Sequence, residues 1–412
     1  MEQKLREYAR LLIEVGLNVR KGQTLVLSSP VDCAPFARLC AEAAYDVGCR
    51  EVVMNWSDDA LSRQKYLRAE DDVFDTVPPW REHFYNDYAA SDIAYLAISA
   101  SDPETLRGVD PQRLVRSQQT AAKAFEGFNR AQMRNDFPWC IASIPIPSWA
   151  VRVFPNVGEE EAVRLLWDAI LQAVRIDGSG TAVARWKEHL DTLERRRDKL
   201  NRLHLRSLHY RNGLGTDLTV RLPDGAVWSS GRGISGRGQP FVANIPTEEI
   251  FTAPHKDGVD GVVYASMPLV EHGNIIDGFS FVLRDGKIVQ AEAKRGGEFL
   301  DAAIHLDEGA SRFGEIALVP YDSPISNQKL LYYNTLFDEN ASCHIAFGEG
   351  YPECLEGGIE MSREERLANG LNDSIAHVDF MVGTSDLSIV GTTKTGEEVT
   401  IFENGNFSEQ LQ

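Results

Sequence analysis

The sequence is poor in cysteine and in long apolar runs. It has six cysteines in 412 residues, and without a Cys-x-x-Cys pair they suggest neither a disulfide framework nor a thiolate zinc site. No apolar run approaches the roughly 18 residues of a membrane span. The stretch 1–22 has the charge pattern of an amphipathic helix rather than of a signal peptide. We therefore expect a cytoplasmic protein with reduced thiols and no membrane partner.

Positive charge is also scarce. Lys and Arg number 42 against 61 Asp and Glu, which gives a formal net charge of -19 at pH 7. Because nucleic acids are held mainly by clustered Lys and Arg, no nucleic-acid partner is expected. The one concentrated basic stretch, residues 194–199, lies in a charged helical pattern and is better explained as a solvated helix face.

Common catalytic sequence motifs are absent, or occur where the surrounding sequence does not fit their function. The sequence contains no GxSxG elbow and no Walker loop, so an α/β-hydrolase triad and a phosphate-cradling loop lack a starting point. The stretch 231–236 matches GxGxxG, but Pro240 and β-type residues follow it, where a pyrophosphate site requires a helix. We interpret this stretch as a loop.

The chain changes character near its middle. Up to about residue 180, short β-branched runs begin at Thr24, Glu51, Ile93 and Cys140, and longer amphipathic stretches lie between and after them. This alternation predicts a mainly parallel sheet covered by helices. A charged helix is expected at about 182–203.

From about residue 205 the chain is rich in strands and turns. Runs such as LTVRL, GVVYAS and LSIVGTTKTGEEVTIF alternate with turn signals, and Asp285-Gly286 predicts a hairpin. We therefore predict two domains: an N-terminal α/β domain with a mainly parallel sheet at residues 1–190, and a β-rich α+β domain at residues 191–412. The second is expected to carry the functional site.

Ionisable groups interrupt strand-like runs in this second half. Glu248 and Glu249 lie in NIPTEEIFTAP, and Glu315 opens a run that otherwise resembles a core strand. Adjacent side chains on an extended backbone face opposite sides, so only one of the two adjacent glutamates easily faces a given pocket. In SIAHVDFMVG, His377 and Asp379 are two residues apart and face the same side.

The nearby stretch DENASCHIAFGEGY adds Glu339, His344 and Tyr351. Each ionisable group alone has an ordinary explanation, such as a strand-edge carboxylate or a hydrogen-bonded core histidine. Together they offer carboxylate oxygens and two imidazoles without thiolates, a ligand set typical of zinc, cobalt or manganese. Four carboxylates match the charge of two divalent cations, and burying them without cations would be costly. These carboxylates are Glu249, Glu315, Glu339 and Asp379.

The sequence blocks around these groups resemble the aminopeptidase T family of metallopeptidases, which includes aminopeptidase S and PepS. The resemblance spans nearly the whole chain and is carried by VGLNVRKGQ, SWAVRVFP, AVRLLWDAI, GLGTDLTVRLP, NIPTEEIFTAP, FGEIALVP, CHIAFGEGY and NDSIAHVDFMVG. It implies a co-catalytic site of two divalent ions (zinc, cobalt or manganese) in an enzyme that releases N-terminal amino acids from peptides. It also implies a homodimer.

The resemblance assigns a role to individual residues. The implied metal ligands are Glu249, Glu315, Glu339, His344, His377 and Asp379. Glu315 corresponds to the ligand that bridges both ions, and Tyr351 to the active-site tyrosine, a donor to the oxyanion. The two ions would activate a shared water and polarise the scissile carbonyl, and one would bind the free α-amine of the substrate. The general base stays open between Glu315 and Glu248.

Two other functions are weighed against the peptidase. The resemblance extends to ring-cleaving dioxygenases of dihydroxypyridines, which hold a single iron(II) with two His and one carboxylate. The additional carboxylates of this chain favour a two-metal peptidase instead. A protein that binds metal or peptide without catalysis would be expected to lack one or more ligands, and every expected ligand is present.

Overall fold

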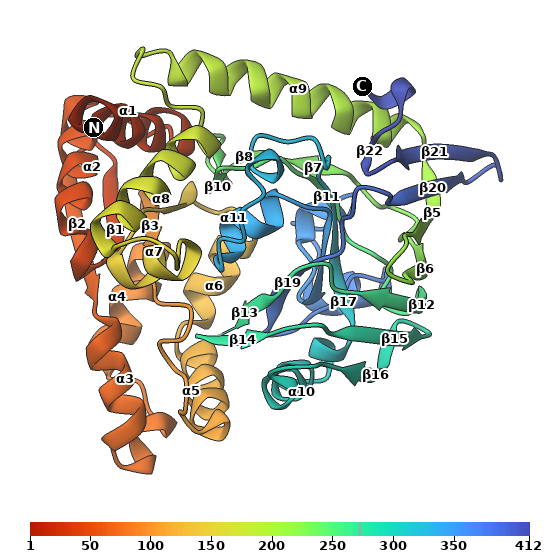
Figure 1. Ribbon diagram of the computed structural model, residues 1–412, viewed down its shortest axis with the longest axis horizontal. Helices are drawn as coiled ribbons and strands as arrows, with labels where there is room; N and C mark the ends of the chain where they lie inside the picture. Colours follow the sequence, from red (N-terminus) through yellow and green to blue (C-terminus); the bar gives the residue numbers. More distant parts are fainter. Residues whose placement is uncertain (272) are drawn as a thin grey trace. The chain divides into compact units, whose positions relative to one another are not determined.

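A computed structural model describes residues 1–271 and 273–412 of the chain. The chain divides into two compact units. The first comprises residues 1–191 and 231–247, and the second comprises residues 192–230 and 248–412. Helices dominate the first unit and strands dominate the second, which Figure 1 shows as a change from red and orange coils to green and blue arrows.

The first unit is built on a five-stranded sheet in the order β10-β4-β3-β1-β2, with parallel pairings throughout. Its strands are β1 (Thr24–Pro30), β2 (Glu51–Ser57), β3 (Ile93–Ser99), β4 (Trp139–Ser143) and β10 (Asn244–Ile245). The four β-branched runs that predicted strands are thus confirmed as β1 to β4. Parallel strands cannot be joined by tight turns, so helices lie between them in the chain.

The helices of the first unit occupy the stretches between and after these strands. They are α1 (Glu2–Leu11), α2 (Ala34–Asp46), α3 (Asp59–Arg68), α4 (Pro79–Ala89), α5 (Pro111–Ala124), α6 (Glu126–Met133), α7 (Pro147–Val153) and α8 (Glu159–Ala173). The charged helix predicted at about 182–203 is confirmed as α9 (Ala182–Arg202), which begins in the first unit and ends in the second. Among the described residues, every helix is too short or too polar to cross a membrane.

The GxGxxG stretch does not open a helix. Residues Arg232–Ile234 form β8, which pairs in antiparallel fashion with β9 (Pro240–Val242). The predicted loop is therefore a short hairpin. A pyrophosphate is bound by the free N–H groups at a helix N-terminus, and this hairpin has none to offer.

An eight-stranded antiparallel sheet forms one layer of the second unit, in the order β16-β15-β12-β6-β5-β20-β21-β22. The strands are β5 (Leu205–Arg211), β6 (Asp217–Arg221), β12 (Val259–Tyr264), β15 (Ser280–Arg284), β16 (Lys287–Glu292), β20 (Ser388–Thr393), β21 (Glu398–Glu403) and β22 (Asn406–Phe407). The predicted hairpin at Asp285-Gly286 is confirmed between β15 and β16. Both turn residues have positive φ, 47° and 76°, as a two-residue hairpin turn requires.

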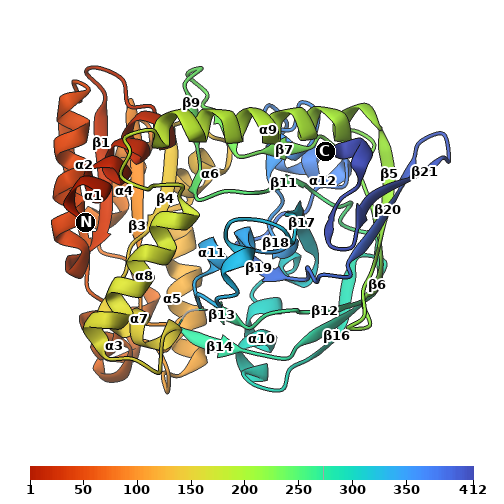
Figure 2. The ribbon, with the colours of Figure 1, turned by 45° about the horizontal axis from the view of Figure 1, so that its top comes forward.

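A second, five-stranded antiparallel sheet, here called the small sheet, has the order β19-β18-β17-β11-β7. Its strands are β7 (Ser229–Ser230), β11 (Ile250–Thr252), β17 (Phe313–Leu318), β18 (His344–Gly348) and β19 (His377–Met381). The unit also contains the strand pair β13 (Leu269–Glu271) and β14 (Asn274–Ile276), and the helices α10 (Gly297–Ile304), α11 (Thr335–Asn340) and α12 (Arg363–Ala368). Helix α11 lies beside β19 (Figure 2).

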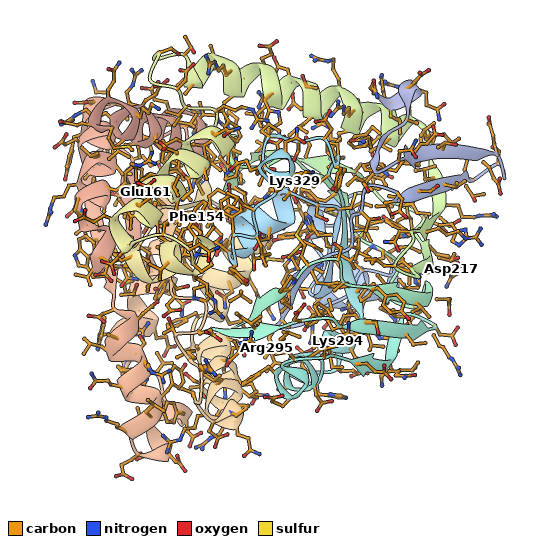
Figure 3. All side chains as sticks on the ribbon, in the orientation of Figure 1. Phe154, Glu161, Asp217, Lys294, Arg295 and Lys329 are labelled. Carbon is orange, nitrogen blue, oxygen red and sulfur yellow. The ribbon has the colours of Figure 1, made fainter. Side chains whose placement is uncertain are left out.

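One apolar core joins the two sheets of the second unit. The large sheet contributes residues such as Leu218 and Phe281, and the small sheet contributes Ile316, Phe347 and Phe380. The ring of Phe281 lies 5.3 Å from that of Phe380 and 6.0 Å from that of Phe347. Figure 3 shows side chains filling the interior of this unit. The small sheet therefore buries one face in the core and can carry polar groups on the other. The predicted combination of a helix-covered parallel sheet and a β-rich part is confirmed.

Candidate metal centre

Alternation along three strands of the small sheet separates a core face from a polar face. Glu315 precedes a core residue on β17, and His344 precedes one on β18. His377 and Asp379 flank a third core residue, Val378, on β19. Because successive side chains of a strand point to opposite faces, these four groups all lie on the face turned away from the core.

The strand register then brings the four side chains together. Glu315 pairs with Ala346, and Ala346 pairs in turn with Asp379. His344 on β18 pairs with Ala317 on β17. Directly paired residues of an antiparallel sheet have neighbouring side chains on one face. Ala317 and Ala346 lie on the same face as these ionisable side chains. Their methyl groups are small, so they leave space in which the longer side chains can approach one another.

A β-bulge interrupts the pairing of β17 with β18 immediately before Glu315. The register of β17 against β18 shifts between Phe313 and Glu315. Gly314 occupies the bulge, and a Cβ atom there would collide with the carbonyl oxygens of Gly348 and Glu349. Glycine is therefore required for this close approach, and bulges of this kind commonly re-aim a side chain beside a functional site.

Donor atoms converge in two overlapping sets. One set holds Glu249, Glu315 and His344, the other holds Glu315, His377 and Asp379, and the donor atoms of each set lie within 4.8 Å of one another. In the first, His344 Nε2 lies 3.0 Å from Glu249 Oε2. In the second, His377 Nε2 lies 3.1 Å from Glu315 Oε2 and 3.4 Å from Asp379 Oδ2. Glu315 is the residue that the two sets share.

Backbone carbonyls orient both imidazoles. His344 Nδ1 lies 2.9 Å from the carbonyl oxygen of Glu339 and 3.0 Å from that of Ser342. His377 Nδ1 lies 2.9 Å from the carbonyl oxygen of Glu349. A carbonyl oxygen only accepts hydrogen bonds, so Nδ1 carries the proton in both rings. Each Nε2 is left facing carboxylates, as is usual for metal-ligating histidines.

Electrostatics show that the cluster has an excess of negative charge. Burial raises the pKa of Glu315 to about 7 and, together with nearby carboxylates, raises the pKa of Glu339 well above its usual range. Burial acts to lower the pKa of His344 and His377, but neighbouring carboxylates outweigh it and raise both pKa values well above the usual range. Without cations the cluster therefore retains protons to balance its carboxylates.

The donor set fits divalent transition-metal ions. Asp379 Oδ1 is buried and has no hydrogen-bond partner among the described residues, so a cation would satisfy an oxygen that the protein leaves without a donor. The donors are carboxylate oxygens and neutral imidazole nitrogens, which suit zinc, cobalt or manganese. Glu339, on α11, lies in neither described set, although its charge acts on Asp379 and His344.

We expect the metal-free protein to lose stability as pH rises. The Glu315 carboxyl ionises near 4.5 when unconstrained and near 7 when folded, so between these values the folded state binds more protons and the free energy of unfolding falls as pH rises. The raised pKa values of His344 and His377 act in the same direction, whereas the lowered pKa of Asp379 affects stability only below its ordinary value of 3.8, outside this window. For Glu315 alone the loss is on the order of 3 kcal/mol.

The measurement is thermal unfolding of chelator-treated and metal-loaded protein at pH 5.5 and pH 8. The rise in Tm on metal loading should be larger at pH 8, where metal replaces the protons that the free cluster has lost. An equal rise at both pH values would contradict this account of the cluster.

Tyr351 and Glu248 lie outside the two donor sets. The ring of Tyr351 stands edge-on to that of His377, with centroids 4.9 Å apart. Burial and the charge of Glu315 raise the pKa of Tyr351 well above its usual range, so its hydroxyl keeps its proton. Glu248 is buried beside Glu249, and its charge acts on the guanidinium of Arg196 in α9. Neither glutamate of the pair belongs to a strand.

Sequence reasoning did not identify Asn340. This residue is fully buried at the end of α11. Its side-chain oxygen accepts a hydrogen bond from the backbone N–H of Glu248 at 2.8 Å, and its Nδ2 donates to Glu339 Oε1 at 3.3 Å. Asn340 therefore ties the turn that carries Glu249 to the helix that carries Glu339. The sequence offered one indication of its role: Asn340 directly follows the candidate ligand Glu339.

Comparison with known proteins places this geometry in a family context. The family model described as thermophilic metalloprotease (M29) matches residues 1–407. Aminopeptidase 2 of Geobacillus stearothermophilus is 43% identical over 410 residues, which cover 100% of this chain and 99% of that protein. The structure of wild-type AmpT from Thermus thermophilus has a TM-score of 0.90 at 37% identity and covers 98% of this chain and 99% of that one.

A dioxygenase structure shows a more distant likeness. The structure of 2,5-dihydroxypyridine dioxygenase from Pseudomonas putida KT2440 has a TM-score of 0.51 at 12% identity, over 100% of this chain and 98% of that one. At this identity the likeness shows a related fold alone.

Proposed function

The chain belongs to the family of thermophilic metalloproteases (M29), and on that premise we propose that its metal centre binds two divalent ions, with zinc, cobalt and manganese as the candidates. The enzyme is a metal-dependent aminopeptidase, a hydrolase that releases N-terminal amino acids from peptides. The family resemblance predicted from the sequence is confirmed. The proposed ligands are Glu249, Glu315, Glu339, His344, His377 and Asp379.

The observation that carries the two-ion proposal is the pair of donor sets with Glu315 in common. A carboxylate has two oxygens, so one glutamate can serve two neighbouring ions. Four carboxylates also match the charge of two divalent cations, whereas one cation would leave two buried negative charges without compensation. When bound, such ions supply the Lewis acidity that activates water and polarises the scissile carbonyl.

Tyr351 is the proposed hydrogen-bond donor to the carbonyl oxygen as negative charge develops on it. Burial is the largest cause of the raised pKa of Tyr351, and burial keeps the hydroxyl protonated even where cations offset the nearby carboxylates. Its ring is held between His377 and Phe251, with centroid distances of 4.9 and 5.8 Å. A donor held in place in this way needs no reorganisation when charge develops, which is the property that makes such donors effective.

Glu248 is the proposed general base. Of the two candidates, Glu315 lies in both donor sets, so its oxygens would be occupied by ions. Glu248 is buried next to the ligand Glu249 but lies in neither set. It can therefore move a proton without giving up a metal ligand. The hydrogen bond from its backbone N–H to Asn340 fixes the turn on which it lies.

The dioxygenase alternative has no support from the donor sets. Each described set contains one imidazole and two carboxylates, whereas a single-iron site of the facial type uses two imidazoles and one carboxylate. A non-catalytic binding protein would be expected to have lost ligands, whereas the sequence retains every ligand that the family resemblance implies. The homodimer stays a prediction carried by the family resemblance, and the cytoplasmic location stays one carried by six free, buried cysteines.

The proposed function is tested by metal content and activity measured on the same preparation. We expect elemental analysis to find two equivalents of divalent metal per chain at saturation. A chelator should abolish hydrolysis of leucine p-nitroanilide, and zinc, cobalt or manganese should restore it. Saturation at one equivalent with full activity would contradict the two-ion proposal, and chelator-resistant hydrolysis by metal-free protein would contradict the metal centre itself.

A further inference from the structure

Three partly buried apolar residues pack against one small buried cluster and are here called the Phe251 surface. Its members are Phe251, Tyr351 and Met361. Two of them, Phe251 and Tyr351, are in ring contact, and the Tyr351 ring contacts that of His377 at the metal centre. The small cluster is separate from the large core of the second unit. That cluster consists of Ala253, Cys354, Leu355 and Leu371. The surface is therefore supported from beneath and keeps apolar area exposed.

Strand register places Phe251 next to the metal ligands. Phe251 on β11 pairs with Ala317 on β17, and Ala317 pairs with His344 on β18. Phe251 therefore shares the polar face of the small sheet, while its neighbour Ile250 lies in the core. Adjacent strands are about 4.8 Å apart, so two strand spacings, about 10 Å, separate the backbone at Phe251 from that at His344.

Phe251 is also the partly exposed position among buried neighbours on β11, β17 and β18. Every residue of β17 and β18 is buried, as are both neighbours of Phe251 on β11, whereas Phe251 itself is partly exposed. Its ring meets Tyr351 edge-on at 5.8 Å, and Tyr351 meets His377 at 4.9 Å. A continuous row of rings thus leads from a ligand to an apolar side chain that nothing in the described chain covers completely.

A polar pair ends the apolar surface on its far side. On β7, Ser229 pairs with Phe251. The hydroxyl of Ser229 donates a hydrogen bond to Glu353 Oε1 at 2.9 Å. Along the sheet, Phe251 therefore lies between the ligand-bearing strands on one side and this serine and glutamate on the other.

We propose that Phe251 forms the subsite for the side chain of the substrate's N-terminal residue and that it favours large apolar side chains such as leucine and phenylalanine. This inference rests on the proposed function. In an aminopeptidase the α-amine and the scissile carbonyl belong to the same residue, so binding both at the metal centre leaves the side chain on their shared Cα to project onto the adjoining surface. An apolar surface there gains free energy when an apolar side chain covers it.

The test compares kcat/KM for leucine and alanine p-nitroanilides in wild-type enzyme and in Phe251→Ala, Phe251→Leu and Phe299→Ala. We expect Phe251→Ala to lower the ratio of kcat/KM for the leucine substrate to kcat/KM for the alanine substrate by about 10- to 100-fold. The ratio is the readout because Phe251 also packs against Tyr351, so any disturbance of that ring affects both substrates alike. Phe251→Leu should recover most of the loss. Phe299, on α10, is a partly buried phenylalanine of the same unit that packs against the large core instead, and its replacement should leave the ratio unchanged.

A binding measurement separates failure of the subsite from failure of the proposed function. Calorimetry of free L-leucine and L-alanine with metal-loaded protein should show tighter binding of leucine, and Phe251→Ala should remove the difference while metal content stays at the wild-type level. Loss of that difference in a protein without turnover would uphold the subsite and reject the peptidase. Equal losses for both substrates, or an unchanged ratio, in an active enzyme would overturn the subsite alone.

Discussion

Replacing Asp379 by asparagine is expected to remove bound metal and hydrolysis together. One carboxylate oxygen of Asp379 lies 3.4 Å from His377 Nε2, and the other is buried without a hydrogen-bond partner among the described residues. The substitution keeps the shape of the side chain but removes a negative charge and places an amide in the donor set. The loss in kcat/KM should exceed the ~10–100-fold that is typical when a residue supporting a ligand is replaced. Elemental analysis and nitroanilide hydrolysis on one preparation measure both effects.

The matched control is Glu248→Gln. It removes the same charge from a buried carboxylate that lies next to a ligand, but Glu248 belongs to neither donor set. Metal content should therefore stay at the wild-type level while kcat falls by about 10²–10⁴-fold, the usual contribution of a general base. Full metal content and full activity in Asp379→Asn would refute its role as a ligand. Metal loss in Glu248→Gln would instead move Glu248 into the ligand set.

Local sequence pattern was sufficient to predict two of the strands that carry the site, β17 and β19. The spacing of His377 and Asp379 places both on one side of β19, because side chains alternate along a strand whatever the strand pairs with. The runs that became β1 to β4 and the turn at Asp285-Gly286 were likewise visible, since β-branched runs and turn residues act over a few positions.

Strand pairing could not be predicted in the same way. The convergence of Glu315, His344 and Asp379 depends on the register of three strands, and between β17 and β18 that register shifts at a bulge. Such pairing reflects tertiary packing of distant segments, and no local pattern encodes it. The same holds for β10, a two-residue strand from beyond residue 240 that joins the edge of the parallel sheet.

The two adjacent glutamates show a second limit. Their predicted opposite orientation assumed an extended strand, but residues 248 and 249 precede β11 in irregular backbone, so strict alternation does not apply to them. Both are buried, and their placement depends on Asn340, which holds the backbone of Glu248 from α11. A buried asparagine whose side chain hydrogen-bonds to the backbone has no sequence signature, because asparagine is also common in exposed turns.

Replacing Tyr351 by phenylalanine is expected to lower kcat by about 10²–10³-fold while both metal ions and KM stay close to wild type. The ring contacts with His377 and Phe251 do not involve the hydroxyl, so phenylalanine preserves the packing and removes only the donor. Loss of one donor to a developing oxyanion typically costs about 3–4 kcal/mol in the transition state and little in the ground state, which is why kcat carries the effect.

The same variant separates a catalytic role of Tyr351 from a structural one. If the hydroxyl supports the ligands, Tyr351→Phe should lose metal, and added metal should restore activity. If it acts on the substrate, metal content and Tm should match wild type and no amount of metal should restore kcat. Because burial, the largest cause of the raised pKa of Tyr351, keeps its hydroxyl protonated, the deficit should be constant between pH 6 and pH 9. A deficit that disappears toward pH 9 would show that the wild-type hydroxyl ionises in this range, and the assignment of Tyr351 as a neutral donor would then be wrong.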